Sequence, residues 1–341
     1  MRRSALLAGG ALAAAALALV LVTARGAADE AVAPATPVPD YSRLSGASLY
    51  ASVEQLKQGW RTDFSRRTVP LRSFQRGGPG RDGIAAVDRP LVVPVSEVDF
   101  LEPEEPVYEL VVGGVARAYP FGTLVVHEIV NDRVGGVPVA VTFCPLCNTA
   151  IAFDRRVDGV PLTFGATGNL RNSDLVMYDR QTESWWQQLG GAALVGRYAG
   201  RTLVKLPGRG IPWREFRELH PDGAVATSVD AKGLPYGENP YLGTLDPARP
   251  APFPVANGDD ARLPPSERVV LVERGGEAVA VAVSLLEREG DVNVELAGET
   301  LRVRLNGRTA DVRDEAGRLV VFSEPFWFAV AAFHPGIGLV R

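Results

Sequence analysis

Apolar residues along most of the chain occur in short runs, rich in valine and aromatic residues and separated by glycine and proline. Runs of this length and composition are typical of β-strands. The runs expected to form strands are 107–112, 116–119, 137–143, 150–153, 269–273, 278–283, 301–305 and 319–322. Helical periodicity is sparse and is found at 48–57, 121–130 and 213–219. We therefore predict an α+β fold that is dominated by strands in antiparallel sheets.

The pattern contains a faint internal repeat. The sequence Gly-Gly-Val-Ala-Arg-Ala at 113–118 resembles Gly-Gly-Glu-Ala-Val-Ala at 275–280, which lies 162 positions later, and the strands at 139–143 and 301–305 keep that spacing. Two similar lobes, at about 41–245 and 246–341, would explain the repeat. Chance similarity between Gly-Gly turns that join valine-rich strands explains it as well.

The first residues of the chain differ from the rest. Arg2 and Arg3 precede an uncharged apolar run at 4–24, which is the pattern of an export signal. The run is also long enough to span a bilayer core of about 30 Å, so cleavage and retention as an anchor both stay open. We expect a signal peptide or membrane anchor at 1–28, a Pro/Ala-rich linker at 29–40 and a folded domain at 41–341. The domain would then lie in the periplasm or cell envelope, with membrane contact through the N-terminal segment alone.

Charge and motif content exclude several classes of function. The net charge of −4 over 341 residues provides no excess of cations for phosphates, so we expect no nucleic-acid partner. The glycine-rich stretch at 165–168 lacks the Lys-Ser/Thr of a P-loop, and no nucleotide cofactor is expected. Ser173, Ser184 and Ser228 lack the flanking glycines of a hydrolase nucleophile.

The candidate chemistry centres on Cys144 and Cys147, the only cysteines of the chain. Strand-like runs flank the Cys-Pro-Leu-Cys sequence on both sides, so we expect a tight knuckle between two strands. A knuckle directs both sulfurs to one place, which is the geometry of a metal-thiolate pair. An oxidising compartment would instead favour a disulfide, either redox-active or structural, and two inert buried thiols are the third possibility.

Two cysteines need further ligands to complete a metal site. His127 lies one hairpin before the knuckle and is the best third candidate. Met177 is the fourth candidate if the ion is copper, because thiolate and thioether ligands select Cu(I), whereas Cys and His ligands suit zinc. His220 and His334 are weaker candidates, since the first caps a predicted helix and the second ends an apolar tail.

A pocket near the knuckle is also predicted. Trp185 and Trp186 are large amphipathic side chains that favour clefts, and Asn172, Asp174 and Tyr178 precede them on an alternating segment. Such a pocket would take a metal ion or a small molecule. Packing in the core explains the same tryptophans without a ligand.

Several ordered motifs resemble the prokaryotic domain of unknown function 3179 family from about Asp82 to the C-terminus. They are ARAYP at 116–120, HEIVND at 127–132, PVAVTFCPLC at 138–147, NSDLVMYDR at 172–180, WQ at 186–187 and FWFAVAAFHP at 326–335. Two positions depart from the family pattern: Asn148 stands where relatives often carry Gly, and Trp185 where a smaller residue often precedes the next tryptophan. The resemblance implies an exported protein without an established reaction, so whether the chain is an enzyme stays undecided.

Together these observations predict an exported envelope protein with a CxxC metal site for copper or zinc. The alternative is a thiol-disulfide oxidoreductase or redox sensor in which Cys144 and Cys147 cycle without a metal. A further alternative is a non-catalytic binding or scaffold module. No protein partner is indicated.

Overall fold

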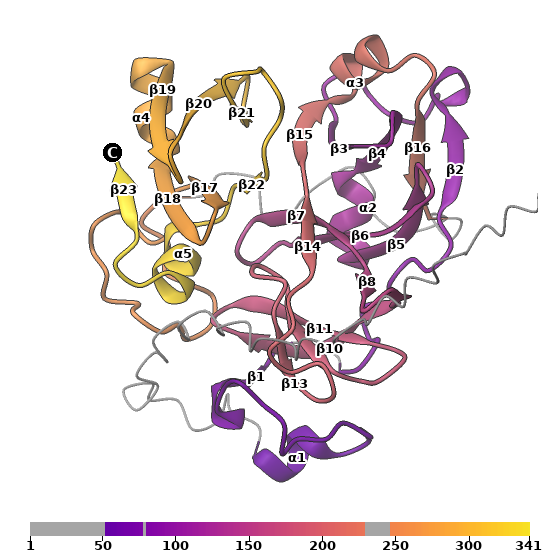
Figure 1. Ribbon diagram of the computed structural model, residues 1–341, viewed down its shortest axis with the longest axis vertical. Helices are drawn as coiled ribbons and strands as arrows, with labels where there is room; N and C mark the ends of the chain where they lie inside the picture. Colours follow the sequence, from indigo (N-terminus) through magenta and orange to yellow (C-terminus); the bar gives the residue numbers. More distant parts are fainter. Residues whose placement is uncertain (1–51, 78–79, 229–245) are drawn as a thin grey trace, which may run out of the picture. The chain divides into compact units, whose positions relative to one another are not determined.

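The computed structural model describes residues 52–77, 80–228 and 246–341 (Figure 1). Contacts divide the chain into Met1–Ala35 and Thr36–Arg341, and every described residue belongs to the second unit. The predicted signal segment and linker lie outside the described residues. Across the three described ranges, none of the helices combines the length and apolar character that a membrane crossing requires.

The prediction of a strand-dominated fold with antiparallel sheets is confirmed. One sheet has the order β15-β3-β4-β16-β2 and a second the order β14-β7-β6-β5. Neighbouring strands in these and the other sheets pair antiparallel, apart from the parallel pairs β4–β16 and β18–β23. The elements at the N-terminal end of the described chain are α1 (Val53–Lys57), β1 (Gln75–Arg76) and β2 (Leu91–Pro94), with 3-10 turns at Leu71–Ser73 and Val95–Glu97.

A hairpin, a helix and a three-stranded meander follow. They are β3 (Pro106–Val112), β4 (Val115–Pro120), α2 (Phe121–His127), β5 (Ile129–Val134), β6 (Val137–Cys144) and β7 (Thr149–Asp154). The predicted helix at 121–130 is too long by three residues. The observed helix α2 ends at His127 because Glu128 adopts a left-handed backbone with φ 58°, and β5 begins at the next residue.

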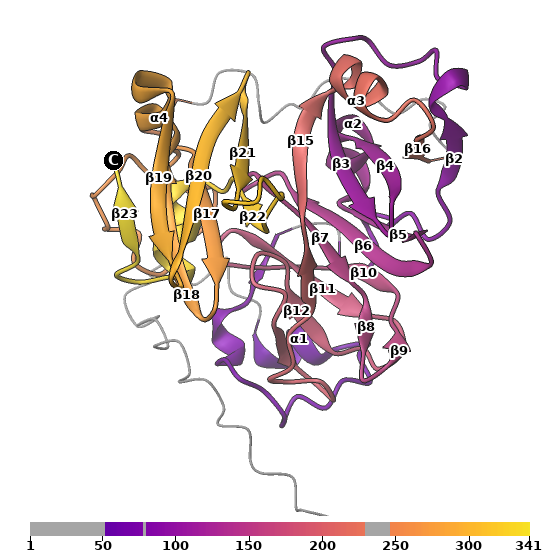
Figure 2. The same ribbon diagram turned by 45° about the horizontal axis from the view of Figure 1, so that its top comes forward.

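The same element order returns in the C-terminal part of the chain (Figure 2). The elements there are β17 (Val269–Arg274), β18 (Glu277–Ala282), α4 (Val283–Glu289), β19 (Asp291–Leu296), β20 (Glu299–Asn306) and β21 (Thr309–Arg313). Of the predicted strand at 319–322, only Phe322 belongs to a strand, β22, while Leu319 forms an isolated bridge with Arg313.

Each of these two parts is completed by a later strand-helix-strand segment. The first segment consists of β15 (Gly208–Pro212), α3 (Trp213–Leu219) and β16 (Ala224–Thr227), and the second of β22 (Phe322–Ser323), α5 (Trp327–Phe333) and β23 (Gly338–Val340). β15 pairs antiparallel with β3 as β22 does with β17, and β16 pairs parallel with β4 as β23 does with β18. The division into two lobes stays a prediction, but the order and pairing of these elements agree between the two parts.

The first part carries an additional sheet between β7 and β15. Its order is β1-β10-β11-β12-β13. The strands of this region are β8 (Arg156–Val157), β9 (Val160–Pro161), β10 (Phe164–Arg171), β11 (Asp174–Asp179), β12 (Trp185–Gln187), β13 (Ala193–Val195) and β14 (Val204–Leu206). The β10–β11 turn brings Asp174 toward the β6–β7 hairpin, as described below.

A buried ion network joins the two parts. The Arg209 guanidinium on β15 donates to Glu109 Oε2 at 2.6 Å and to Asp311 Oδ2 on β21 at 2.8 Å. All three side chains are buried. Removing one partner of such a pair typically costs about 3–5 kcal/mol, because the other charge is left buried and unpaired.

Two glycine turns pack closely together in the first part. Gly135 begins the β5–β6 turn with φ +53°, and a Cβ there would lie 2.1 Å from the Val112 carbonyl oxygen. Its neighbour Gly136 has φ +81° and nothing within 4 Å of such a Cβ. The first position therefore requires glycine for space as well as for backbone conformation.

We expect Gly135→Ala to lower the free energy of unfolding by about 3 kcal/mol or more, since it adds a clash to the cost of a left-handed alanine. Gly136→Ala, which adds only the left-handed alanine, should cost about 1 kcal/mol. Chemical denaturation of both variants measures the difference. Equal losses would contradict the proposed close approach of the two turns.

Candidate functional site

The two cysteines lie at the turn of the β6–β7 hairpin. Cys144 ends β6 and pairs with Thr149 at the start of β7, so residues 145–148 form the connection. Asn148 closes this connection with a left-handed backbone, φ 58°. Asparagine accepts this conformation more readily than most residues, which explains how it stands where glycine would also fit. The predicted knuckle between two strands is therefore present, and both thiols are free and buried.

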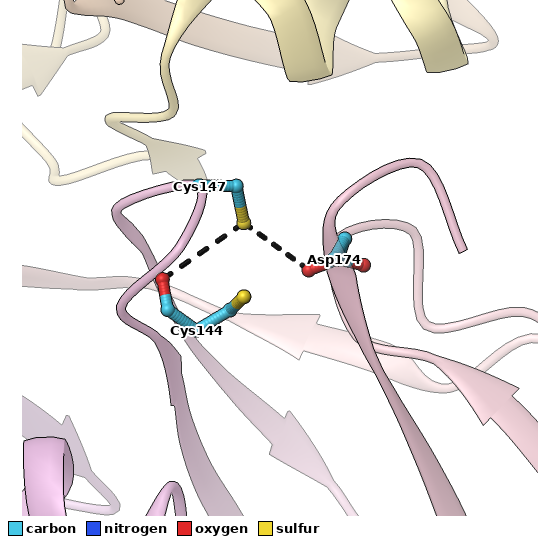
Figure 3. A group of neighbouring side chains, drawn as sticks. All are labelled: Cys144, Cys147 and Asp174. Carbon is cyan, nitrogen blue, oxygen red and sulfur yellow. Dashed lines mark hydrogen bonds between the residues drawn. The ribbon is translucent and has the colours of Figure 1, made fainter. Parts of the chain in front are cut away.

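The third member of the site comes from the additional sheet. Asn172 and Ser173 form a left-handed turn after β10, with φ 55° and 58°, and Asp174 begins β11 directly after it. Cys147 Sγ donates to Asp174 Oδ1 at 3.2 Å, and Figure 3 shows the carboxylate directed toward both sulfurs. The potential ligand atoms of Cys144, Cys147 and Asp174 all lie within 4.8 Å of one another. These three residues are close enough to hold one metal ion.

Asp174 is held in place by hydrogen bonds on its outer side. Its Oδ2 accepts from Gln187 Nε2 at 2.6 Å and from the Leu189 backbone N–H at 3.0 Å. Gln187 in turn accepts from Arg171 Nη1 at 3.1 Å. This arrangement leaves Oδ1 facing the sulfurs, as second-layer hydrogen bonds orient ligands in metal sites.

Burial dominates the electrostatics of the site. Cys144 is 1% exposed, and Cys147 and Asp174 are 0% exposed. Loss of solvation raises the pKa of both thiols, that of Cys147 well above its usual value, and it raises the pKa of Asp174 despite the hydrogen bonds that lower it. Without a cation, the site therefore favours neutral thiols.

A second buried carboxyl group belongs to the same region. Glu128 is the left-handed residue that ends α2, and burial together with the negative charge of Asp174 raises its pKa to about 8. Its charge also contributes to the raised pKa of Cys144. Sequence reasoning did not single out Glu128, although it follows His127 directly in a motif of the family.

The structure does not place His127 in this group. Among the described residues, the cluster of His, Cys, Asp and Glu ligand atoms around the sulfurs contains Asp174 as its third member. The His127 ring instead lies with Nδ1 2.7 Å from the Ala85 carbonyl oxygen. Met177 is fully buried in the hydrophobic cluster that includes both cysteines. The predicted ligand roles of His127 and Met177 stay predictions.

The other two histidines lie at the ends of short helices. His220 follows α3 and its Nε2 lies 2.7 Å from Glu109 Oε1. His334 follows α5, with Nε2 3.7 Å from Glu273 Oε1, and burial lowers its pKa. Both are held by glutamates that are not part of the cysteine cluster.

The residues predicted to wall a pocket are distributed over several environments. Trp185 packs edge-on against Trp60, Phe64 and Phe74, whereas Trp186 belongs to the cluster with the cysteines and donates from Nε1 to Asp179 Oδ2. The Tyr178 hydroxyl donates to Asp82, and Asn172 Oδ1 accepts from the Ala256 backbone N–H. Of the five predicted residues, Asp174 alone contributes a potential ligand atom to the group with Cys144 and Cys147.

A later stretch of the chain covers the site. The Phe326 backbone N–H donates to the Cys147 carbonyl oxygen at 3.0 Å. The Ser173 hydroxyl donates to the Phe253 carbonyl oxygen at 2.8 Å, and the Phe253 N–H donates back to that hydroxyl at 3.0 Å. An ion would therefore enter before this cover closes or when it opens.

Comparison with known proteins yields one family. A family model described as "Protein of unknown function (DUF3179)" matches residues 81–323, which include the whole cysteine cluster. No curated protein matches the chain. No solved structure matches it either.

The raised pKa of Glu128 makes stability depend on pH. The folded state favours the neutral form of the Glu128 carboxyl group. Its contribution to the free energy of unfolding is therefore fully present below its ordinary pKa of 4.5 and is lost as the pH rises through about 8. Glu128→Gln stays neutral throughout. In metal-free protein, the variant should thus gain stability relative to wild type between pH 4.5 and 8.

Chemical denaturation at several pH values measures this gain. Glu54→Gln makes the same chemical change at a side chain that is 85% exposed and is the control for the substitution itself. Parallel curves for wild type and Glu128→Gln would contradict the burial of this carboxyl group.

Proposed function

Because the chain belongs to the DUF3179 family of proteins of unknown function, the family supplies no reaction, and we propose a function from the site itself. We propose that Cys144, Cys147 and Asp174 bind a single metal ion and that the ion is zinc. The observation that carries the proposal is the convergence of two thiols and one carboxylate, all fully buried, within 4.8 Å of one another.

A bound cation would offset the free energy that it costs to ionise these three buried acidic groups. Three acidic groups in one buried place cannot all ionise without a positive partner, and burial raises the pKa of each of them. A divalent ion favours the deprotonated form of all three and replaces their protons. The cluster is therefore costly as a purely structural feature and well suited to a ligand set.

The donor set favours zinc over copper. Cu(I) selects soft sulfur donors, and the third donor here is a carboxylate oxygen. Zinc accepts thiolate and carboxylate ligands in one tetrahedral site. With three protein ligands a fourth position is left for water or a substrate, and a zinc ion there would supply Lewis acidity. Asp174 is fixed by Gln187 and Leu189, so the chain itself provides the orientation.

The thiol-disulfide alternative has less support. Catalytic redox cysteines have a lowered pKa and partial exposure, because the thiolate is the reactive species. Here both thiols are buried and both pKa values are raised. A binding or scaffold module without a metal would have no need for a buried cluster of three acidic groups.

We further propose that the protein acts outside the cytoplasm. The support comes from the sequence alone, namely the arginine pair and the uncharged run at 4–24. The described domain would then meet metal ions in the periplasm or envelope, whether the N-terminal segment is cleaved or kept as an anchor.

Zinc affinity tests the metal site. Anaerobically purified, metal-free protein should bind one zinc ion in competition with a chromophoric chelator, with free thiols counted in the same sample. Cys144→Ser, Cys147→Ser and Asp174→Asn should each weaken binding by about 100-fold or more, since each removes a ligand. Affinity should rise steeply between pH 6 and 8, because binding displaces the thiol protons that burial retains.

Matched variants distinguish this ligand set from one that includes His127 or Met177. Asp154→Asn alters a partly buried aspartate that pairs with Arg156 and is not part of the cysteine group, and it should leave affinity unchanged. His127→Ala should weaken binding less than Asp174→Asn, and Met177→Leu should have no effect on zinc. Stoichiometric zinc binding by the Cys144→Ser/Cys147→Ser double variant would overturn the proposal.

Export is tested with residues 1–40 fused to a reporter enzyme that is active only outside the cytoplasm. We expect activity for the natural segment and none when Leu17 and Leu19 are both changed to Arg, since each charge in the apolar run costs about 3 kcal/mol of insertion free energy. Blot sizes distinguish a cleaved signal from a retained anchor. A natural segment that leaves the reporter inactive would contradict export.

A further inference from the structure

A groove of about 520 Å³ lies beside α1 at the N-terminal end of the described chain. Its lining residues come from α1, from the loop that follows and from the 3-10 turn at Leu71–Ser73. They are Val53, Lys57, Phe64, Ser65, Arg67, Pro70, Leu71 and Arg72. The volume lies within the range of about 300–1,000 Å³ that is usual for pockets that bind small molecules.

The apolar part of the lining is anchored in the hydrophobic core. Phe64 and Leu71 are each 8% exposed and belong to one hydrophobic cluster with Trp185. The Phe64 ring meets the Trp185 ring edge to face, with centroids 5.3 Å apart. Val53 adds an aliphatic side chain that is 36% exposed. An aliphatic chain in the groove would therefore meet a preformed surface.

Three cations line the same groove, and none of its lining residues within the described ranges is acidic. The Arg67 guanidinium donates from Nη1 to the Phe64 carbonyl oxygen at 2.9 Å, and the backbone at Arg67 forms a bridge with Val195. These contacts hold the Arg67 side chain in place. Arg72 is exposed, and its guanidinium forms no ion pair with any residue that the structure describes.

Two carboxylates lie close to the groove, and neither neutralises its cations. Glu54 Oε1 lies 3.8 Å from Lys57 Nζ, but the two side chains are 85% and 41% exposed, and such an ion pair contributes little. Asp63 accepts from the Ser65 backbone N–H at 3.0 Å and from the Ser65 hydroxyl at 2.5 Å, within its own turn. The groove therefore keeps an excess of positive charge in a chain whose net charge is −4.

This combination of lining groups restricts the ligand. A single arginine can bind a carboxylate through two parallel hydrogen bonds, so three cations provide more charge than a carboxylate balances. A phosphate monoester carries about 1.5 to 2 negative charges at neutral pH and has three strong acceptor oxygens. The apolar lining favours a chain on the ester oxygen, because that chain removes apolar surface from water.

We propose that this groove binds a phosphate monoester with a short aliphatic chain. The phosphate lies among Lys57, Arg67 and Arg72, and the chain packs on Phe64 and Leu71. The apolar wall beside the cations strengthens their attraction for the phosphate, since it lowers the local dielectric constant. The site is separate from the proposed metal site, because Phe64 and Leu71 belong to a different hydrophobic cluster from the two cysteines.

Hexyl phosphate is the probe. Calorimetric titration of the full-length protein at low ionic strength should give a saturable Kd of about 0.1–5 mM, the range for a ligand of about eleven heavy atoms. Inorganic phosphate and ethyl phosphate should bind about 10-fold more weakly or less, because both leave the apolar lining in water. Hexanoate, which has a single charge, should also bind at least about 10-fold more weakly.

A short-chain phospholipid distinguishes a membrane lipid from a soluble ester as the source of the phosphate. Dihexanoyl phosphatidylglycerol is a diester with one negative charge, so it should bind at least about 5-fold more weakly than hexyl phosphate. The affinity for hexyl phosphate should also fall as the pH drops through about 6, where a phosphate monoester takes up its second proton. The lysine and the two arginines stay charged over this range.

Two variants test the assignment of the cations. Arg72→Gln removes one charge from an exposed side chain and should weaken binding of hexyl phosphate about 10-fold. Arg67→Lys keeps the charge but loses the planar fork, and should weaken binding by a smaller factor of about 3. Arg217→Gln makes the same change as the first variant at an exposed arginine on α3, outside the groove lining, and should bind like wild type.

Four results would overturn the proposal. They are no binding of hexyl phosphate, equally tight binding of inorganic phosphate or hexanoate, equally tight binding of the phospholipid, and wild-type affinity in Arg72→Gln with an unchanged melting temperature.

Discussion

The alternation of side chains along one hairpin is the constraint on which the cysteine site depends. Successive residues of a strand point to opposite faces, and the register of β6 with β7 pairs Phe143 with Ala150 and Cys144 with Thr149. Phe143 and Ala150 line the space between the two parts of the fold, whereas the Cys144 sulfur lies in the group with Cys147 and Asp174. A slip of one residue in β6 would turn Cys144 to the opposite face, away from Asp174. The antiparallel pairing of β6 with β5 and with β7 fixes this register and so fixes the position of Cys144.

Some buried polar groups of this molecule have a full set of hydrogen-bond and ionic partners, and others do not. The Arg209 network is closed, since its guanidinium and the carboxylates of Glu109 and Asp311 find partners on both parts of the fold. The group of Cys144, Cys147 and Asp174 is different, because burial raises the pKa of all three acidic groups and so opposes their ionisation. Folding stability alone favours the closed arrangement. The open arrangement at the cysteines indicates a position where a cation would complete the interior.

The sequence predicted the hairpin that carries Cys144 and Cys147, but it did not predict that Asp174 lies beside the two sulfurs. Valine-rich runs on both sides of Cys144 and Cys147 were enough to predict a knuckle with converging sulfurs, because strand pairing between adjacent runs is local. Asp174 was predicted only as a pocket residue. Its position beside the sulfurs depends on how the additional sheet packs against the β6–β7 hairpin, and the sequence around Asp174 carries no pattern that indicates this packing. His127 was predicted to face the sulfurs from its distance along the chain. Its actual contact with Ala85 depends on the segment around Val87, which pairs with Val130 and has no strand-like periodicity of its own.

The cover over the thiol cluster separates how tightly an ion would be held from how fast it would leave. Affinity would depend on Cys144, Cys147 and Asp174, whereas escape requires the hydrogen bonds of Ser173 with Phe253 and of Phe326 with Cys147 to open. Local opening can cost anything from almost no free energy up to that of global unfolding, so the exchange rate of a buried ion depends on the chain around it. Residence time would therefore be a property of the surrounding chain as well as of the three ligands, and a substitution outside the site could change it without changing the ligand set.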